Sequence, residues 1–241
     1  MPSVGSLVLG AEELDESFFR LIPSRFPTVD VYRRIAAPSR WPILNEIELL
    51  TNTRQKERTA ILGSDVVDGA PPRLQNWNHA PFVYIDPEGS HLVSGAYGVM
   101  ELGTTKSVAL AMAVARREIF LSATAQPPHA LEMRMLRHPL RGRFARLGDL
   151  SKITQDERWV LGESLYQEWD GAVFDCPVAS EGQTIAVFNS ECLGKSIQGD
   201  HFRFWWDGSR IENIYNFNEK SKDNKGYDPY ESIMALRDRA A

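Results

Sequence analysis

The stretch GVMELGTTKSVALAMAVARREIFL begins at residue 98 and runs from a strand-like segment through a short polar loop into an alanine-rich helix. Junctions of this kind often hold phosphates, because the first amides of a helix point at the loop. A P-loop needs G-x-x-x-x-G-K-[ST], and Gly98 and Gly103 have the required spacing. Lys106, however, comes two positions late. The loop therefore predicts a helix capped by Thr104 or Thr105, and the chain contains no G-x-G-x-x-G that would indicate a Rossmann site.

Nucleophiles, histidines and metal ligands form no recognisable motif. The chain has no G-x-S-x-G, which the nucleophile elbow of a serine hydrolase would require. Cys176 and Cys192 show neither metal-ligand spacing nor a disulfide framework, so we expect no metal site. Cys176 lies in FDCPVASEGQ, at the end of an expected strand, where a thiol could be presented, although a free cysteine is more often a small buried apolar residue. The five histidines are scattered along the chain: His79, His91, His129, His138 and His201.

Arginines cluster near the N-terminus, where Arg20, Arg25, Arg33 and Arg34 fall within fifteen residues. Arginine suits bidentate recognition of carboxylates and phosphates. Alternation along a strand places Arg34 and Tyr32 on one face and Arg33 on the other. One of the adjacent arginines should therefore face inward and need an anion, either a carboxylate of the protein or a nucleotide phosphate; the spacing leaves both open.

Composition excludes several classes of protein. The 241-residue chain is 43% hydrophobic and 24% charged, which is ordinary for a globular protein. Its formal charge of −5 gives no electrostatic case for nucleic acid binding. No apolar run is long enough to span a membrane, and the acidic start does not resemble a secretory signal. Together with the cysteine usage, these features predict a reducing, cytoplasmic compartment.

The hydrophobic pattern predicts an α+β fold in one domain, with mixed or antiparallel sheets and flanking helices. We expect a loose lead-in over residues 1–17, the domain over 18–217 and a polar tail over 218–241, with a long loop at 52–80. A hairpin is expected at Asp207-Gly208, and a capping box at Thr154 before a helix. Strands are expected at 29–35, 81–85, 95–102, 129–136, 171–176 and 184–188, and a helix at 43–50.

Several motifs, in order over about residues 18–215, resemble the RES-domain family. They are FFRLIPSRFPTVDVYRRIA, EIELLTNTR, FVYIDPEGS followed by YGV, FLSATAQPP, DGAVF with EGQTIAVF, and QGDHFRFWWDGSRI. RES proteins are mostly toxins of bacterial toxin–antitoxin pairs with an ADP-ribosyltransferase-like fold. They consume NAD by phosphorolysis or hydrolysis of the nicotinamide–ribose bond, or by ADP-ribosylating a target. The resemblance thus implies NAD as ligand or substrate and a possible antitoxin-like protein partner.

Carried over residue by residue, the family's functional set is largely replaced here. The leading arginine falls on Arg34 and is expected to contact the dinucleotide phosphates, while a second arginine falls on His91. A tyrosine of the family falls on Glu101, the helical glutamate on Met112 and the distal serine on Cys176. Methionine supplies neither charge nor a strong hydrogen bond. The usual machinery for cleaving NAD is therefore dismantled in this chain.

Two replacements are conceivable. Glu101 could supply the lost carboxylate from the opposite wall of the pocket, or it could simply pair with Arg34 or face solvent. Cys176 could act as a nucleophile. With Tyr32 and with Tyr97 of the YGV motif as further ligand contacts, we expect a divergent RES protein that binds NAD or a related nucleotide and cleaves it, or transfers from it, with an altered catalytic set. The alternatives are a non-catalytic binding or regulatory module and an active NAD-consuming toxin.

Overall fold

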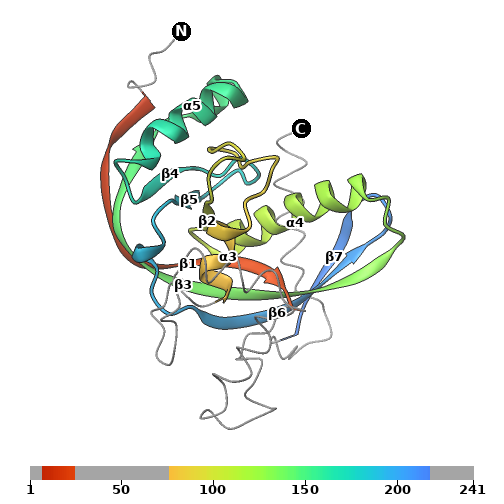
Figure 1. Cartoon of the computed structure of the whole chain (residues 1–241). Coiled ribbons are helices and arrows are strands. Elements are labelled where there is room, and N and C mark those ends of the chain that lie inside the picture. The colour runs from red at the N-terminus through yellow and green to blue at the C-terminus, as the bar shows by residue number, and fades with distance from the viewer. Residues whose placement is uncertain (1–6, 25–75, 218–241) are drawn as a thin grey trace, which may run out of the picture.

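Five strands close into a ring, and two more extend it on one side. The computed structural model describes residues 7–24 and 76–217. Its sheet has the strand order β1-β2-β5-β4-β3-β6-β7, and β1 also pairs with β3, which closes the ring β1-β2-β5-β4-β3 (Figure 1). The strands of this described part are β1 (Val8–Pro23), β2 (Met100–Gly103), β3 (His129–Leu147), β4 (Gly171–Asp175), β5 (Gln183–Val187), β6 (Ile197–Trp206) and β7 (Ile211–Asn216).

Helices flank this mixed sheet, so the α+β class is confirmed. They are α3 (Asn76–Val83), α4 (Lys106–Ala123) and α5 (Gln155–Tyr166), with short 3-10 turns η5 (Leu150–Lys152) and η6 (Ser190–Cys192). The chain passes from β3 through α5 into β4, which pairs with β3 in parallel. The other strand pairs are antiparallel, including the hairpins β4–β5 and β6–β7. One βαβ unit is thus embedded in an otherwise antiparallel fold.

The longest pairing joins β1 to β3, from Val8 opposite Leu147 to Pro23 opposite Met133. The loose lead-in expected over residues 1–17 is therefore wrong for residues 8–17, which form more than half of β1. The acidic side chains that suggested a loose segment face arginines of β3: Glu12 lies 2.9 Å from Arg146. These pairs are exposed and contribute little, so the strand rests on its backbone ladder. Its partner lies more than 120 residues away, which hid the pairing from local patterns.

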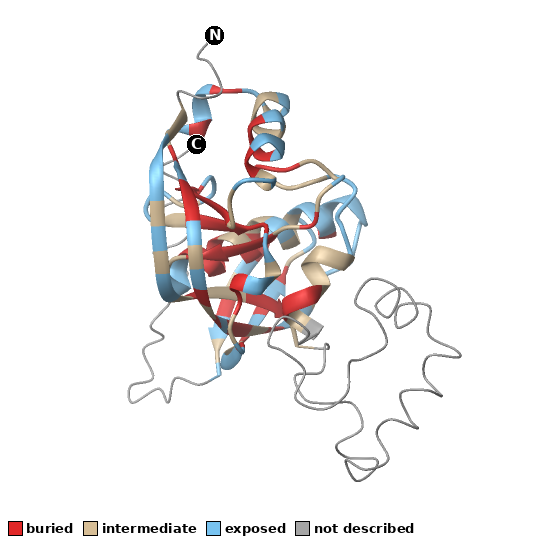
Figure 2. Cartoon of the chain, turned by 60° about the vertical axis from the view of Figure 1, so that its left-hand side comes forward, coloured by how far each residue is buried: buried red, intermediate tan, exposed pale blue. Residues whose placement is uncertain are grey.

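Three apolar clusters pack inside the ring of strands and against the outer face of the sheet. One fills the ring and includes Phe18, Met100 and Phe144. A second lies under α5 and covers the outer face of β4 and β5, and a third lies between α4 and the β6–β7 hairpin. Figure 2 shows the buried residues concentrated on the strands and on the inner sides of the helices. The two helices therefore cover neighbouring parts of one outer face of the sheet.

The local motifs of the sequence fold as predicted. The hydroxyl of Thr105 caps α4 by accepting from the Val108 amide at 3.2 Å. Thr154 and Glu157 form the capping box of α5. The β6–β7 hairpin turns at Asp207-Gly208, where Gly208 has a φ of +106° that favours glycine.

Other expected elements differ or lie elsewhere. The run at 81–85 was expected to be a strand, but Pro81–Val83 end helix α3, and residues 76–80 of the expected loop begin it. Burial of Asn78 and His79, which are 0% and 4% exposed, overrides the strand-like composition. The expected strand at 29–35, the helix at 43–50 and the tail at 218–241 lie outside the described residues. Within the described ranges, no helix is both long and apolar enough to cross a membrane.

Candidate functional site

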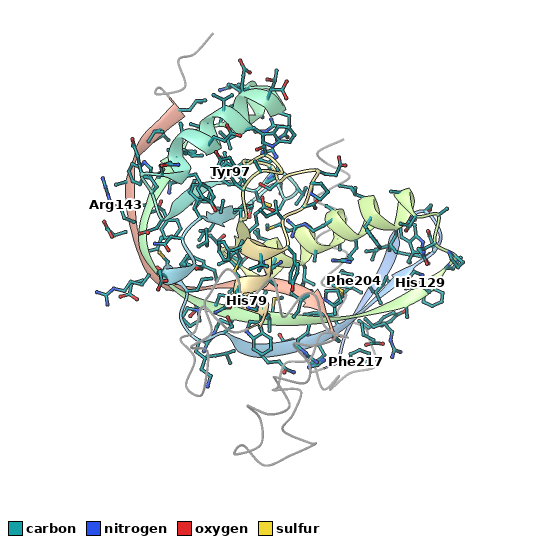
Figure 3. All side chains as sticks on the ribbon, in the orientation of Figure 1. His79, Tyr97, His129, Arg143, Phe204 and Phe217 are labelled. Carbon is teal, nitrogen blue, oxygen red and sulfur yellow. The ribbon has the colours of Figure 1, made fainter. Side chains whose placement is uncertain are left out.

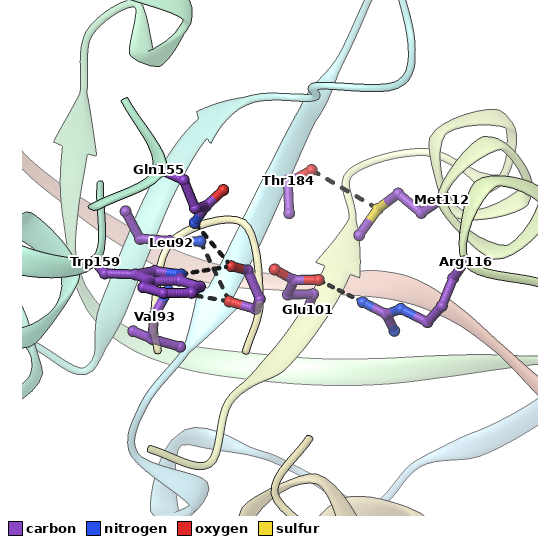
Figure 4. A network of polar contacts seen from close by, with 9 residues as sticks. Leu92, Val93, Glu101, Met112, Arg116, Gln155, Trp159 and Thr184 are labelled. Atoms are coloured by element: carbon purple, nitrogen blue, oxygen red, sulfur yellow. Dashed lines mark hydrogen bonds and ion pairs between the residues drawn. The ribbon is translucent and has the colours of Figure 1, made fainter. Parts of the chain in front are cut away.

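The candidate site lies on the outer face of β2 and β5, between α4 and α5. Register places Glu101 opposite Ala186 and Gly103 opposite Thr184. Because paired residues of neighbouring strands share a face, Glu101 and Thr184 point to the side covered by the two helices. Figure 4 shows Glu101 with Arg116 and Met112 of α4 on one side and residues held by α5 on the other.

Helix α5 fixes the loop that borders this face. The side chains of Gln155 and Trp159 donate to the carbonyl oxygen of Ser90 at 3.2 and 3.0 Å. Arg158 donates from Nε to the carbonyl oxygen of His91 at 3.2 Å. The loop that carries His91 is thereby anchored before the chain enters β2.

Glu101 is a buried carboxylate with one oxygen in use and one unused. The residue is 8% exposed. Its Oε2 accepts from Arg116 Nη2 at 2.5 Å, whereas its Oε1 is shielded from solvent and has no hydrogen-bond partner. The Arg116 side chain is about half exposed, at 49%. The ion pair therefore reaches from the core to the surface, and a buried acceptor remains free for a hydrogen-bond donor.

Arg20 of β1 belongs to the same electrostatic neighbourhood. Its side chain is half-buried, and its Nε is shielded and unpartnered. Burial, and then the nearby cations Arg116 and Arg117, lower the pKa of Arg20 to about 10, although Glu101 opposes the shift. We call Glu101, Arg116 and Arg20 the charged cluster.

Neither Arg20 nor Arg116 was among the predicted site residues. The resemblance assigned the leading arginine to Arg34, and both Arg34 and Tyr32 lie outside the described residues. Arg20 meets the same description, because it precedes the apolar Leu21 in the first strand. The sequence FFRL contains this pattern of an arginine before an apolar residue, but the pattern can be assigned to the first strand only when β1 is recognised as a strand.

Met112 occupies the face of α4 that borders the charged cluster. It lies one turn before Arg116, so the two side chains share a helix face. Its half-buried sulfur accepts a weak hydrogen bond from the Thr184 hydroxyl at 3.7 Å. The helix position that the resemblance assigns to a catalytic carboxylate thus holds a thioether in contact with the sheet.

His91 joins this face, whereas Tyr97 packs elsewhere. The His91 ring stacks on Phe174 with centroids 5.7 Å apart. Burial lowers the pKa of His91, and Arg158 adds to this while Glu101 opposes it, so the imidazole is neutral at pH 7. The Tyr97 ring contacts Tyr166 at 4.7 Å, beside α5 (Figure 3). The predicted residues Glu101, Met112 and His91 therefore converge, and Tyr97 supports the helix.

The two thiols are buried. Cys176 follows β4, and its amide donates to the Gly182 carbonyl at 3.0 Å, which continues the β4–β5 ladder. Strand alternation places its side chain on the Phe174 face. Its catalytic role stays a prediction. Burial and then the hydrogen bond to Asp170 raise the pKa of Cys192 to about 12, so this thiol is inert.

A second polar cluster, the neutral cluster, consists of His138, Asn78 and Ser196. All three are buried. Asn78 donates from Nδ2 to the Gly194 carbonyl at 3.0 Å, which directs its Oδ1 to the other two side chains. His138 Nδ1 lies 3.1 Å from Asn78 Oδ1 and 2.6 Å from Ser196 Oγ. The Ser196 hydroxyl also donates a hydrogen bond to Asn78 Oδ1. Because Asn78 Oδ1 only accepts, His138 Nδ1 carries the proton and cannot take one from Ser196. The cluster is structural rather than a serine–histidine nucleophile pair.

No cluster with the composition of a metal site occurs among the residues that the structure describes. The chemistry available on the α4–α5 face is therefore that of a buried carboxylate, the arginine paired with it, a neutral imidazole and a hydroxyl, with the charge of Arg20 within electrostatic range from the other side of β1. These groups can bind an anionic ligand that also carries hydroxyl groups.

A comparison with known proteins finds a relative that matches most of the chain. No family model matches the chain. The chain is 39% identical over 214 residues to "Uncharacterized protein y4oC" of Sinorhizobium fredii (strain NBRC 101917 / NGR234), and the match covers 87% of this chain and 91% of that protein. At this identity and coverage, the chain belongs to the same family as y4oC.

Proposed function

We propose that the protein is a divergent RES-domain protein that binds NAD or a related nucleotide on the α4–α5 face. The observations that carry the proposal are the unused buried oxygen of Glu101 and the unpartnered guanidinium nitrogen of Arg20, which lies within electrostatic range of Glu101. A buried acceptor and a buried donor without partners are costly unless something fills them. The resemblance to RES proteins, with its ADP-ribosyltransferase-like fold and cytoplasmic setting, supports a nucleotide as that ligand.

Each group has a definite role in this proposal. Glu101 Oε1 accepts a hydrogen bond from a ribose hydroxyl, which is a donor that the diphosphate of a dinucleotide lacks at neutral pH. Arg20 donates to a phosphate, for which a planar guanidinium is well suited. The neutral ring of His91, already stacked on Phe174, offers an apolar surface for a base.

Binding without turnover is the version that the geometry favours. Cleavage of the nicotinamide–ribose bond develops positive charge on the ribose, and a nearby carboxylate stabilises it. In this protein Arg116 lies 2.5 Å from Glu101, so the positive charge of Arg116 offsets much of the negative potential of the carboxylate. Met112 supplies no charge. The second candidate is cleavage with Glu101 as the carboxylate, favoured by its position on β2 facing α4.

Calorimetry tests the binding step. Purified protein is titrated with NAD, ADP-ribose and AMP. Losing one charged hydrogen bond costs about 1.5–3 kcal/mol, so Glu101→Gln and Arg20→Gln should each weaken NAD binding roughly tenfold or more. Arg141→Gln is the matched control, because its side chain is 83% exposed and pairs loosely with Asp15 at 3.8 Å. Equal NAD affinity in the wild type, Arg20→Gln and Glu101→Gln proteins would remove this site.

Nicotinamide release separates the two candidates. Wild-type protein is incubated with NAD, with and without inorganic phosphate. Release at the rate of the buffer alone, together with measurable NAD binding, supports the binding module. Release that is lost in Glu101→Gln supports cleavage by the altered set, and release that persists in that variant contradicts a role for Glu101.

A further inference from the structure

The groups around Glu101 on the α4–α5 face carry more positive than negative charge. Arg116 already matches the carboxylate of Glu101, with Nη2 of the arginine 2.5 Å from Oε2. Arg20 adds a second cation, which lies on the other side of β1 but within electrostatic range of Glu101. Arg20 forms no ion pair with a carboxylate of residues 7–24 and 76–217, so the charged cluster as a whole is cationic.

Helix α5 supplies a further arginine that pairs with no carboxylate in the part of the chain that the structure describes. The Arg158 guanidinium donates to the carbonyl oxygens of His91 and Ile153 at 3.2 and 2.8 Å, and to the amide oxygen of Gln155 at 2.7 Å. These acceptors are dipoles without net charge, so they satisfy the donors of the guanidinium but do not cancel its charge. Burial, and then this charge, lower the pKa of His91, so the cation acts on the candidate site.

The other groups described on this face are neutral. The His91 ring is uncharged at pH 7, and Met112 and Thr184 contribute a thioether and a hydroxyl. A ligand therefore meets one carboxylate whose charge Arg116 offsets, together with the fields of Arg20 and Arg158. Such a potential favours negative charge on a ligand and opposes positive charge.

Nucleotides of the class proposed above differ in this property. Oxidised NAD combines two phosphate charges with a cationic pyridinium ring, whereas NADH has the same phosphates and an uncharged dihydropyridine ring. ADP-ribose has the phosphates and no nicotinamide. All three present the ribose hydroxyls and the diphosphate that Glu101 and Arg20 are proposed to hold, so NAD and NADH differ mainly in the charge of one ring.

We infer that the α4–α5 face selects nucleotides without a positively charged ring, and that it binds NADH and ADP-ribose in preference to oxidised NAD. This inference rests on the proposed function and names the class of nucleotide that the same site takes. The pyridinium charge is repelled by Arg116, Arg20 and Arg158, because like charges brought together on binding weaken a complex. The same repulsion acts on the positive charge that develops on the ribose during cleavage, which agrees with binding without turnover.

Calorimetry with oxidised NAD, NADH and ADP-ribose tests this selectivity on the full chain. NADH should bind about fivefold or more tightly than oxidised NAD, and ADP-ribose at least as tightly as oxidised NAD. Salt provides a second readout, because raising it from about 0.15 M to about 1 M shortens the Debye length from about 8 Å to about 3 Å. The ratio of the NAD and NADH dissociation constants should then fall by about half or more.

Arg116→Gln tests the electrostatic origin of the preference. Arg116 is half exposed, so the variant should fold. Removing this cation leaves the negative potential of Glu101 without its offset, so the preference for NADH over oxidised NAD should disappear or reverse. A contact that both nucleotides lose cancels in the ratio of their dissociation constants. Arg141→Gln, at an exposed position of β3, should keep the wild-type ratio.

Three outcomes contradict the inference, and one of them also removes the site. Equal binding of NADH and oxidised NAD by the wild type, or tighter binding of oxidised NAD, would overturn the selectivity and leave the nucleotide site in place. An unchanged preference in Arg116→Gln or at about 1 M salt would mean that the shape of the ring decides, and not its charge. Failure of all three nucleotides to bind would remove the proposed function itself, and this inference with it.

Discussion

The charged cluster and the neutral cluster both interrupt the apolar core, and both contain a polar atom without a partner. In the charged cluster such atoms are Glu101 Oε1 and Arg20 Nε, and in the neutral cluster the atom is His138 Nε2. The charged cluster includes Arg116, which is half exposed, whereas every side chain of the neutral cluster is at least 95% buried. The charged cluster is therefore connected to solvent through Arg116, whereas the neutral cluster is closed to solvent.

This difference separates a candidate binding site from a structural link. A sealed cluster can hold neutral groups only if they satisfy one another, and Asn78 does this by joining α3, β3 and the segment before β6. A charged group needs either a partner or water, and Arg116 keeps both. We therefore expect mutations in the neutral cluster to change stability, and mutations in the charged cluster to change ligand binding.

The largest effect is expected for Asn78→Leu. This variant keeps the side-chain volume but removes the donor to the Gly194 carbonyl and the oxygen that His138 and Ser196 share in the core. The loss of these buried hydrogen bonds should cost about 3 kcal/mol of unfolding free energy. Urea denaturation measures this loss, and NAD binding per folded molecule should not change. A loss below about 1 kcal/mol would show that the neutral cluster is not a structural link.

A smaller effect is expected from pH. Burial, with Arg20 nearby, lowers the pKa of His138 to about 3, against about 6.5 in the unfolded chain. Between these values the unfolded chain binds one more proton, so the stability contribution of His138 is lost as the pH falls. From pH 7 to pH 5 this group should account for about 2 kcal/mol.

His138→Gln isolates the pH-dependent contribution of His138 to stability. The variant removes the titrating imidazole and leaves a side chain that can still hydrogen-bond with Asn78. Denaturation of both proteins at pH 7 and pH 5 should show a steeper loss in the wild type. Parallel losses in the two proteins would mean that His138 is open to solvent, and the contrast between the clusters would disappear.

Local interactions could be predicted from the sequence. The caps at Thr105 and Thr154 and the turn at Asp207-Gly208 each depend on residues within a few positions, and all three are confirmed. The first half of β1 could not be predicted, because its partner strand lies more than 120 residues further along the chain. The same reason hid the strand position of Arg20.

The candidate site was only partly predictable for a related reason. The resemblance singled out Glu101, Met112 and His91, and the structure brings them to one face. It did not indicate that Glu101 pairs with Arg116, which depends on how α4 packs across β2. Pairing of Glu101 with Arg34 was one of two alternatives, and Arg34 lies outside the described residues; spacing alone carries no information on a contact between distant elements.

The smallest effect on stability is expected for Glu101→Gln. Although Glu101 is buried, its partner Arg116 remains half exposed and can be hydrated when the pair is lost, so the charge of Arg116 is not left uncompensated in the core. The amide is also cheaper to bury than the carboxylate. The unfolding free energy should change by less than about 1 kcal/mol, and a double-mutant cycle with Arg116→Gln should give a coupling of the same size. A loss of about 3 kcal/mol or more would make Glu101 a structural residue like Asn78. The distinction between the clusters would then fail, because the exposure of Arg116 to solvent would not have reduced the cost of losing its pair with Glu101.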